Sequence, residues 1–135
     1  MASHLRLLRS DGPDSPASGL SLRADDGMEA VVSLMAAITA GGRLDRLGVI
    51  AQEHLSTGGK RMRARLCLAA AAALGVNRLD AVPWAASIEL LHNAPLVHDD
   101  IQDGDLIRRG QPTVWVRHGV AQAMQWPYLV LLALA

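Results

Sequence analysis

Apolar positions recur at three- and four-residue steps along most of the chain, which is the pattern of amphipathic α-helices. Val31, Leu34, Met35 and Ile38 mark the first such segment, which begins near residue 28 and ends at 41–42. Further helices are predicted over about 44–55, 60–74, 80–103 and 113–135, the last interrupted near Gly119. No strand alternation or internal repeat is evident. Short connections favour antiparallel neighbours, so the fold class is an all-α, antiparallel helical bundle.

The chain divides into two parts. Residues 1–27 are expected to form a flexible N-terminal lead, because Ser, Asp, Gly and Pro dominate residues 10–19. Residues 28–135 are expected to form the helical domain. Half of the 135 residues are hydrophobic, and Phe is absent. Such a composition supports a buried core and favours helices over strands.

Charge and cysteine content exclude several classes. Lys plus Arg is 13 and Asp plus Glu is 13, which argues against a general nucleic-acid binder. The single Cys67 excludes an intramolecular disulfide framework and a Cys-rich zinc site. No secretory signal is evident, and the longest uncharged stretch, 119–135, is shorter than the roughly 20 residues of a transmembrane helix. A cytoplasmic protein with no transmembrane segment is therefore expected.

The acidic end of the fourth predicted helix is the strongest chemical signal. Asp99, Asp100 and Asp103 are spaced so that the first and third, and the second and third, share a helix face. Like charges this close become favourable around a hard cation such as Mg²⁺. An acidic surface or capping cluster is the alternative, although the helix dipole disfavours anions at this end.

Two basic clusters flank the acidic one. In the first, Gly58-Gly59 precedes Lys60 and Arg63, whose three-residue spacing puts both cations on one side of a helix N-terminus. A solvated basic turn is the alternative for this cluster taken by itself. The second is Arg108-Arg109-Gly110. Arg suits bidentate phosphate contact, so two anion sites and a metal site together indicate two phosphorylated substrates.

In order and spacing, these motifs resemble the trans-isoprenyl diphosphate synthases, the polyprenyl synthetases that include farnesyl and geranylgeranyl diphosphate synthases. The resemblance covers roughly residues 44–123 and rests on three linked segments. They are Gly58-Gly59-Lys60-Arg61-x-Arg63, Glu89-Leu-Leu-His92-Asn-Ala-x-Leu-Val-His-Asp99-Asp100-x-x-Asp103 and Leu106-Ile-Arg108-Arg109-Gly110-x-Pro112-Thr113. Three linked motifs are far more specific than any one of them.

The resemblance implies a helical isoprenoid synthase fold around a deep apolar cavity, with Mg²⁺ as cofactor. The substrates implied are isopentenyl diphosphate and an allylic prenyl diphosphate. The catalytic residues implied are Asp99, Asp100 and Asp103, which would hold Mg²⁺ on the allylic diphosphate, and Arg108, which would contact the same diphosphate. Isopentenyl diphosphate would be bound by Lys60, Arg63, His92 and Arg109, with Gly59 allowing close approach. Arg61 matches the motif with a less defined role.

The resemblance also implies a length for the prenyl chain of the product. In this family, bulk about one turn before the first acidic motif blocks the growing prenyl chain. Ala94 and Pro95 occupy those positions here, and Ala94 is small. A geranylgeranyl or longer product is therefore implied. Pro95 departs from the residues usual at its position and is expected to kink the helix.

The sequence departs from the family pattern in two places. Residues 124–128 read Met-Gln-Trp-Pro-Tyr where small residues and an acid are usual, and a second aspartate-rich motif does not follow. Two hypotheses remain. The chain is the N-terminal half of a prenyltransferase that is inactive at this length, or it is a non-catalytic truncated chain or regulatory partner of a full-length synthase. Exposure of Val130, Leu131 and Leu132 is expected to drive homo-oligomer or hetero-partner formation.

Overall fold

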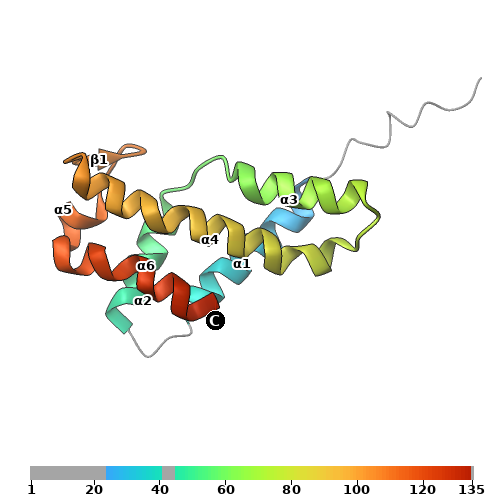
Figure 1. Ribbon diagram of the computed structural model, residues 1–135, viewed down its shortest axis with the longest axis horizontal. Coiled ribbons are helices and arrows are strands. Elements are labelled where there is room, and N and C mark those ends of the chain that lie inside the picture. Colours follow the sequence, from blue (N-terminus) through green and yellow to red (C-terminus); the bar gives the residue numbers. More distant parts are fainter. Residues whose placement is uncertain (1–23, 41–44, 135) are drawn as a thin grey trace, which may run out of the picture.

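The computed structural model describes residues 24–40 and 45–134, which fold almost entirely into helices (Figure 1). The helices are α1 (Ala24–Ala40), α2 (Asp45–Ser56), α3 (Met62–Ala73), α4 (Arg78–Gln102), α5 (Val114–His118) and α6 (Val120–Leu134). A two-stranded antiparallel ribbon, β1 (Ile107–Arg108) and β2 (Gln111–Pro112), connects α4 to α5. The predicted all-α class is confirmed.

The longest helix, α4, is the central element, and α1, α3 and α6 pack against it. Figure 1 shows α3 running along one side of α4 and α6 along the other. Ala85, Ala86, Leu90 and Val97 of α4 are completely buried. The helix continues without interruption through Pro95 to Gln102, so its acidic C-terminal end is attached to the main core.

Local sequence signals fix the junction between α3 and α4. Gly75 has a φ of 71°, a left-handed conformation that glycine adopts without strain, and it lets the Val76 N–H donate to the Ala71 carbonyl at 2.9 Å. Asn77 then caps α4, because its side chain accepts a hydrogen bond of 2.9 Å from the Leu79 N–H. The two helices are therefore joined by a short turn and lie as antiparallel neighbours.

The first helix begins earlier than the sequence pattern indicated. α1 starts at Ala24, four residues before the expected start at Met28. Gly27 lies inside this helix, and a Cβ there would come within 2.9 Å of Arg78 Cδ. Its lack of a side chain allows α1 to approach the start of α4. Residues 1–23 of the expected lead lie outside the described residues.

The ribbon was not predicted, because two residues per strand are too few to produce an alternating pattern. Its register pairs Ile107 with Pro112 and Arg108 with Gln111. Thr113 N–H donates to the Leu106 carbonyl at 3.0 Å and extends the pairing by one bond. The segment expected to be a loop is thus a defined turn that orients both of its arginines.

The expected exposure of Val130 is wrong. Ala123, Trp126 and Val130 are spaced at i, i+3 and i+7 on α6, and all three are completely buried. This face of α6 is the one that packs against α4, whereas Met124 and Tyr128 are exposed. The side chains of Leu131 and Leu132, also expected to be exposed, lie outside those described.

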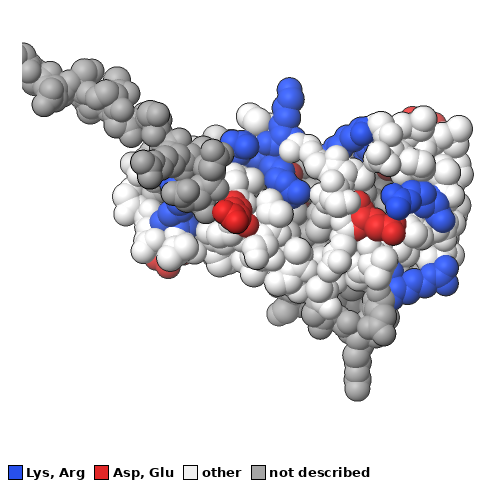
Figure 2. Space-filling model, turned by 180° about the vertical axis from the view of Figure 1, so that it is seen from behind, with Lys and Arg blue, Asp and Glu red and all other residues white. Residues whose placement is uncertain are grey.

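Charged side chains are distributed in small groups. Figure 2 shows separate patches of Lys and Arg on one face, with Asp or Glu beside some of them and uncharged surface between. Within residues 24–40 and 45–134, no helix is both long enough and apolar enough to cross a membrane.

Candidate active site

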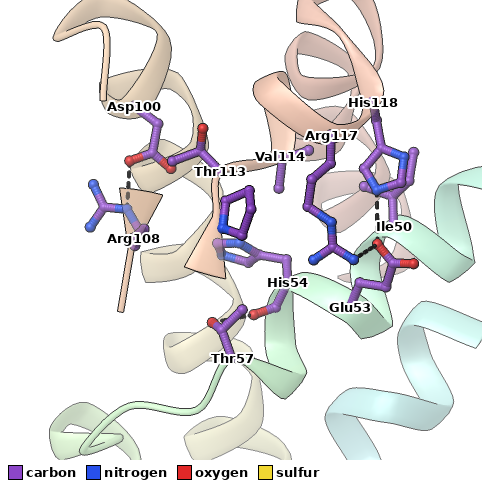
Figure 3. Close-up of a pocket in the computed structure, with 11 residues that line it drawn as sticks. Ile50, Glu53, His54, Thr57, Asp100, Arg108, Thr113, Val114, Arg117 and His118 are labelled. Carbon is purple, nitrogen blue, oxygen red and sulfur yellow. Dashed lines mark hydrogen bonds and ion pairs between the residues drawn. The ribbon is translucent and has the colours of Figure 1, made fainter. Parts of the chain in front are cut away.

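The three aspartates at the end of α4 do not occupy equivalent environments. Asp99 and Asp103 are exposed, and the Asp103 N–H donates to the Asp99 carbonyl at 2.8 Å, so the helical turn that puts them on one face is intact. Asp100 is only 1% exposed. It points inward to β1, where Arg108 Nε donates to its Oδ1 at 2.5 Å (Figure 3).

Asp100 therefore anchors the ribbon to the helix. Burial raises the pKa of the Asp100 carboxyl, Arg108 opposes that rise through its hydrogen bond and charge, and the neighbouring Asp105 and Asp99 add to it. The second carboxylate oxygen, Oδ2, is buried without a hydrogen-bond partner in the described part of the chain. Removing Arg108 would leave this buried carboxylate without its counter-charge.

Two of the three carboxylates, those of Asp99 and Asp103, are exposed and could hold Mg²⁺, whereas Asp100 pairs with Arg108. Magnesium is commonly held by one or two carboxylates together with waters and substrate phosphates. Asp99 and Asp103 provide two hard oxygen donors on one exposed helix face. Across the described residues, no three His, Cys, Asp or Glu side chains converge in a metal-binding group. A cation held by these two carboxylates alone would need further oxygen ligands.

The glycine-rich loop contacts the ribbon directly. Arg109, in a left-handed conformation with φ 53°, donates a hydrogen bond from its guanidinium to the Gly58 carbonyl. At Gly59, a Cβ would come within 2.8 Å of the Arg109 Cζ. Gly59 was expected to allow the approach of a ligand, and in this structure it allows the approach of Arg109. The loop and the ribbon, 51 residues apart in sequence, form one wall of the site.

Arg61 and Glu89 have structural contacts in the same region. The Arg61 guanidinium donates to the Leu55 carbonyl at 3.1 Å, which ties the loop back to α2. Glu89 is buried, and its Oε2 accepts a hydrogen bond of 3.2 Å from the Ala64 N–H in the first turn of α3. Because the first N–H groups of a helix lack intrahelical acceptors, Glu89 satisfies one of them and fixes α3 against α4.

His92 lies within the electrostatic influence of several predicted anion-binding residues. Burial lowers the pKa of His92, the charges of Arg63, Arg109 and Arg108 lower it further, and Glu89 opposes them. Arg63 and Lys60 are exposed at the start of α3. The structure therefore gathers positive charge from α3 and from the ribbon around one helix position.

A second polar group, not identified from the sequence, lies on the other side of the pocket from the Asp100–Arg108 pair (Figure 3). Glu53 on α2 accepts hydrogen bonds from Arg117 at 2.7 Å and from His118 at 2.8 Å, both at the end of α5. The contact spans at least 64 residues in sequence, and no local motif signals it. It holds α5 and the ribbon that precedes it against α2.

His54 is the other unexpected residue. It is buried, and its ring packs against Trp126 with 5.5 Å between ring centroids and planes tilted by 59°. Trp126 belongs to the segment that departs from the family pattern. The large side chain there fills space beside α2 and covers the histidine. No feature of the sequence separates His54 from an ordinary polar residue at the end of a helix.

The arrangement is that of the isoprenoid synthase fold. A geranylgeranyl pyrophosphate synthetase from Geoglobus acetivorans superposes with a TM-score of 0.73 at 33% identity, over 81% of this chain and 36% of that one. A decaprenyl diphosphate synthase from Rhodobacter capsulatus gives a TM-score of 0.75 at 30% identity, over 80% and 33% of the two chains.

The sequence pattern of the polyprenyl synthetase family matches residues 45–133, and the chain belongs to that family. Among similar curated proteins, a geranylgeranyl diphosphate synthase from Mycobacterium tuberculosis is 54% identical over 66 residues, which are 49% of this chain and 19% of that protein. A (2E,6E)-farnesyl diphosphate synthase from Mycobacterium bovis is 48% identical over 66 residues, 49% and 18% of the two chains. The chain thus spans about a fifth of the length of these relatives.

Protonation of His54 is predicted to make stability depend on pH. Burial, aided by the charges of Arg109 and Arg108 and opposed by a hydrogen bond with Asn93, lowers the pKa of His54 from 6.5 to about 4. As the pH falls below 6.5 the unfolded chain binds a proton that the folded chain does not, so the free energy of unfolding decreases. The loss is complete below about pH 4 and amounts to about 3 kcal/mol.

Urea unfolding at intervals between about pH 4 and pH 7 measures this effect. His54→Gln should lack the His54 component of the pH dependence, whereas His118→Gln, which changes a neighbouring histidine, should keep it. The same pH slope in wild type and His54→Gln would contradict the prediction.

Proposed function

We propose that this chain is the N-terminal part of a Mg²⁺-dependent prenyltransferase that condenses isopentenyl diphosphate with an allylic prenyl diphosphate. The observation that carries the proposal is the exposed Asp99–Asp103 face next to Arg108, with Arg109, Arg63 and His92 close by. The names of the relatives, which are geranylgeranyl and farnesyl diphosphate synthases, support the same reaction.

In this proposal the two substrates use different parts of the site. Asp99 and Asp103 would hold Mg²⁺ on the allylic diphosphate, and Asp100 would act by holding Arg108 toward that diphosphate. The bound Mg²⁺ would supply charge neutralisation for the leaving diphosphate. Cleavage of the allylic C–O bond releases diphosphate, the isopentenyl double bond attacks the resulting carbocation, and a proton is lost.

The isopentenyl diphosphate would contact the second group of cations, beside Gly59. The residues proposed to bind it are Lys60, Arg63, His92 and Arg109. Arg109 already donates to the Gly58 carbonyl, so its guanidinium is oriented before the ligand arrives. An oriented donor loses less conformational entropy when the ligand binds. A dry apolar wall would protect the carbocation.

A non-catalytic role is the second candidate function, in which the chain binds and regulates a full-length polyprenyl synthase. The exposed apolar side chains of α4 favour it. Trp84 is 70% exposed, Ile88 40% and Leu91 46%, and their i, i+4, i+7 spacing puts them on one face. Under either function, we expect no condensation by residues 1–135 alone.

Binding of inorganic diphosphate with Mg²⁺ tests the proposed site directly. Asp99→Ala should weaken Mg²⁺-dependent diphosphate binding at least about tenfold, because even partners outside the first coordination sphere usually contribute that much. Isothermal titration with and without Mg²⁺ measures the change. Asp80→Asn, at the opposite end of α4, removes the same charge and should bind like wild type. Equal affinity for Asp99→Ala and Asp80→Asn would refute the metal site.

We also propose a geranylgeranyl or longer product. Ala94 is 6% exposed, one turn before the aspartates, and a small side chain there leaves room for a growing chain, whereas Pro95 is exposed. In a catalytically complete form that contains this segment, Ala94→Phe should shorten the product made from isopentenyl and farnesyl diphosphates.

Chromatography of the products measures that change in length. Ala85→Phe introduces the same bulk at another buried α4 position and controls for overpacking, which costs about 1–3 kcal/mol. A wild-type product that stops at C15, or equal lengths from both variants, would exclude this assignment.

The apolar face of Trp84, Ile88 and Leu91 is proposed as the contact for a homo-oligomer or a hetero-partner. The double variant Trp84→Lys/Leu91→Lys should shift residues 1–135 toward monomer, because burying a charged side chain in an apolar contact costs free energy. Light scattering after size exclusion measures the species. Leu79→Lys changes an equally exposed residue on the opposite face of α4 and should leave the assembly intact. A strictly monomeric wild type would count against the proposal.

A further inference from the structure

Two buried polar atoms in one pocket have no hydrogen-bond partner among the described residues. They are His54 Nε2 on α2 and Asp100 Oδ2 at the end of α4. Both residues line the pocket between α2, the end of α4, β2 and α5 (Figure 3). Buried polar atoms are almost always hydrogen-bonded, so two of them in one pocket point to a shared partner.

The size of the pocket limits what that partner is. The space in it that the centre of a water-sized molecule can occupy is about 10 Å³, which corresponds to one water molecule. Polar groups surround this space on several sides, including Thr57, Thr113 and the Glu53–Arg117–His118 group. A small polar cavity with unsatisfied atoms is the setting in which buried water is found in proteins.

The hydrogen-bonding roles of the two atoms also fit one water. Burial lowers the pKa of the His54 ring to about 4, so the ring is neutral near pH 7, and its Nε2 has no partner among the described residues. A neutral imidazole that donates through one nitrogen presents the other as an acceptor. Asp100 Oδ2 belongs to a carboxylate whose Oδ1 already accepts from Arg108. A single water has two O–H donors and can satisfy both atoms.

We propose that one buried water bridges His54 Nε2 and Asp100 Oδ2, which makes His54 a positioning residue for the Asp100–Arg108 pair. The water holds the Asp100 carboxylate from behind while Arg108 holds it from the ribbon side. Rotation of the carboxylate is then restricted, and Arg108 is kept in one orientation toward the anion site. This role of His54 rests on the proposed diphosphate site, whereas the water bridge itself depends only on the fold.

The bridge is tested on residues 1–135 without any ligand. A high-resolution crystal structure at neutral pH should show one ordered water within hydrogen-bond distance of both atoms. No ordered water at that position, or direct contact between His54 and Asp100, would overturn the bridge.

The positioning role is tested by two variants of His54, one that keeps a hydrogen-bond acceptor and one that does not. His54→Gln keeps a polar acceptor near the Nε2 position, and His54→Met replaces the ring by an apolar side chain. Binding of inorganic diphosphate with Mg²⁺ should weaken about tenfold or more in His54→Met, and should return to within a few-fold of wild type in His54→Gln. His118→Gln, on the same pocket, should bind like wild type. Unfolding midpoints of all variants separate this effect from lost stability.

Equal loss of diphosphate affinity in His54→Gln and His54→Met at equal stability would refute the positioning role. The outcomes also separate this inference from the proposed function. If wild type binds no diphosphate with Mg²⁺, the proposed function and the positioning role both fail, while the crystal structure still decides the water bridge. If wild type binds and Asp99→Ala does not, but His54→Met matches wild type, only the positioning role fails.

Discussion

The contact between Asp100 and Arg108 organises this end of the molecule. A buried carboxylate without a counter-charge is strongly disfavoured, so the chain after α4 must turn back and deliver a cation to it. The ribbon does so eight residues later, with Arg108 Nε at 2.5 Å from Asp100 Oδ1. The pairing of β1 with β2 then fixes where the next residue, Arg109, projects. One desolvated ion pair thus determines the placement of both arginines.

The second arginine closes the site from the other side. Arg109 has a positive φ, which is uncommon for a residue with a side chain, and this turns it away from its neighbour. Its guanidinium meets the Gly58-Gly59 loop, where the absence of a Cβ leaves room for it. The loop leads directly into α3, and Glu89 holds the start of α3 to α4. The chain therefore connects α2, α3, α4 and the ribbon around one polar site.

Periodicity in the sequence was sufficient to predict most of the helices, because burial of one face dominates their formation. It could not show that Gly27 belongs to a helix, since that depends on the close approach of Arg78. Spacing likewise identified the three aspartates but not which one turns inward. The direction of Asp100 follows from its pairing with Arg108.

Contacts between residues far apart in the sequence could not be predicted from local sequence patterns. Glu53 meets Arg117 across 64 positions, and His54 meets Trp126 only because α6 folds back against α4 and α2. The motif residues themselves were recognisable because their chemistry is concentrated in short segments. Thus the residues of the proposed diphosphate site could be identified from the sequence, whereas the residues that support them from other helices could not.

Without a ligand, like charges in the proposed site repel one another and lower the stability of the fold. Asp99 and Asp103 share a face on which like charges repel, and the dipole of α4 disfavours both of them at its C-terminal end. On the opposite wall, Arg63, Arg108 and Arg109 all lower the pKa of His92, which means that their positive potentials overlap there. Bound together, a divalent cation and an anionic diphosphate would relieve both repulsions at once, whereas either ion by itself would relieve only one. This coupling explains why a fold would keep two unfavourable clusters so close together, and it implies that cation and diphosphate bind more tightly as a pair than separately.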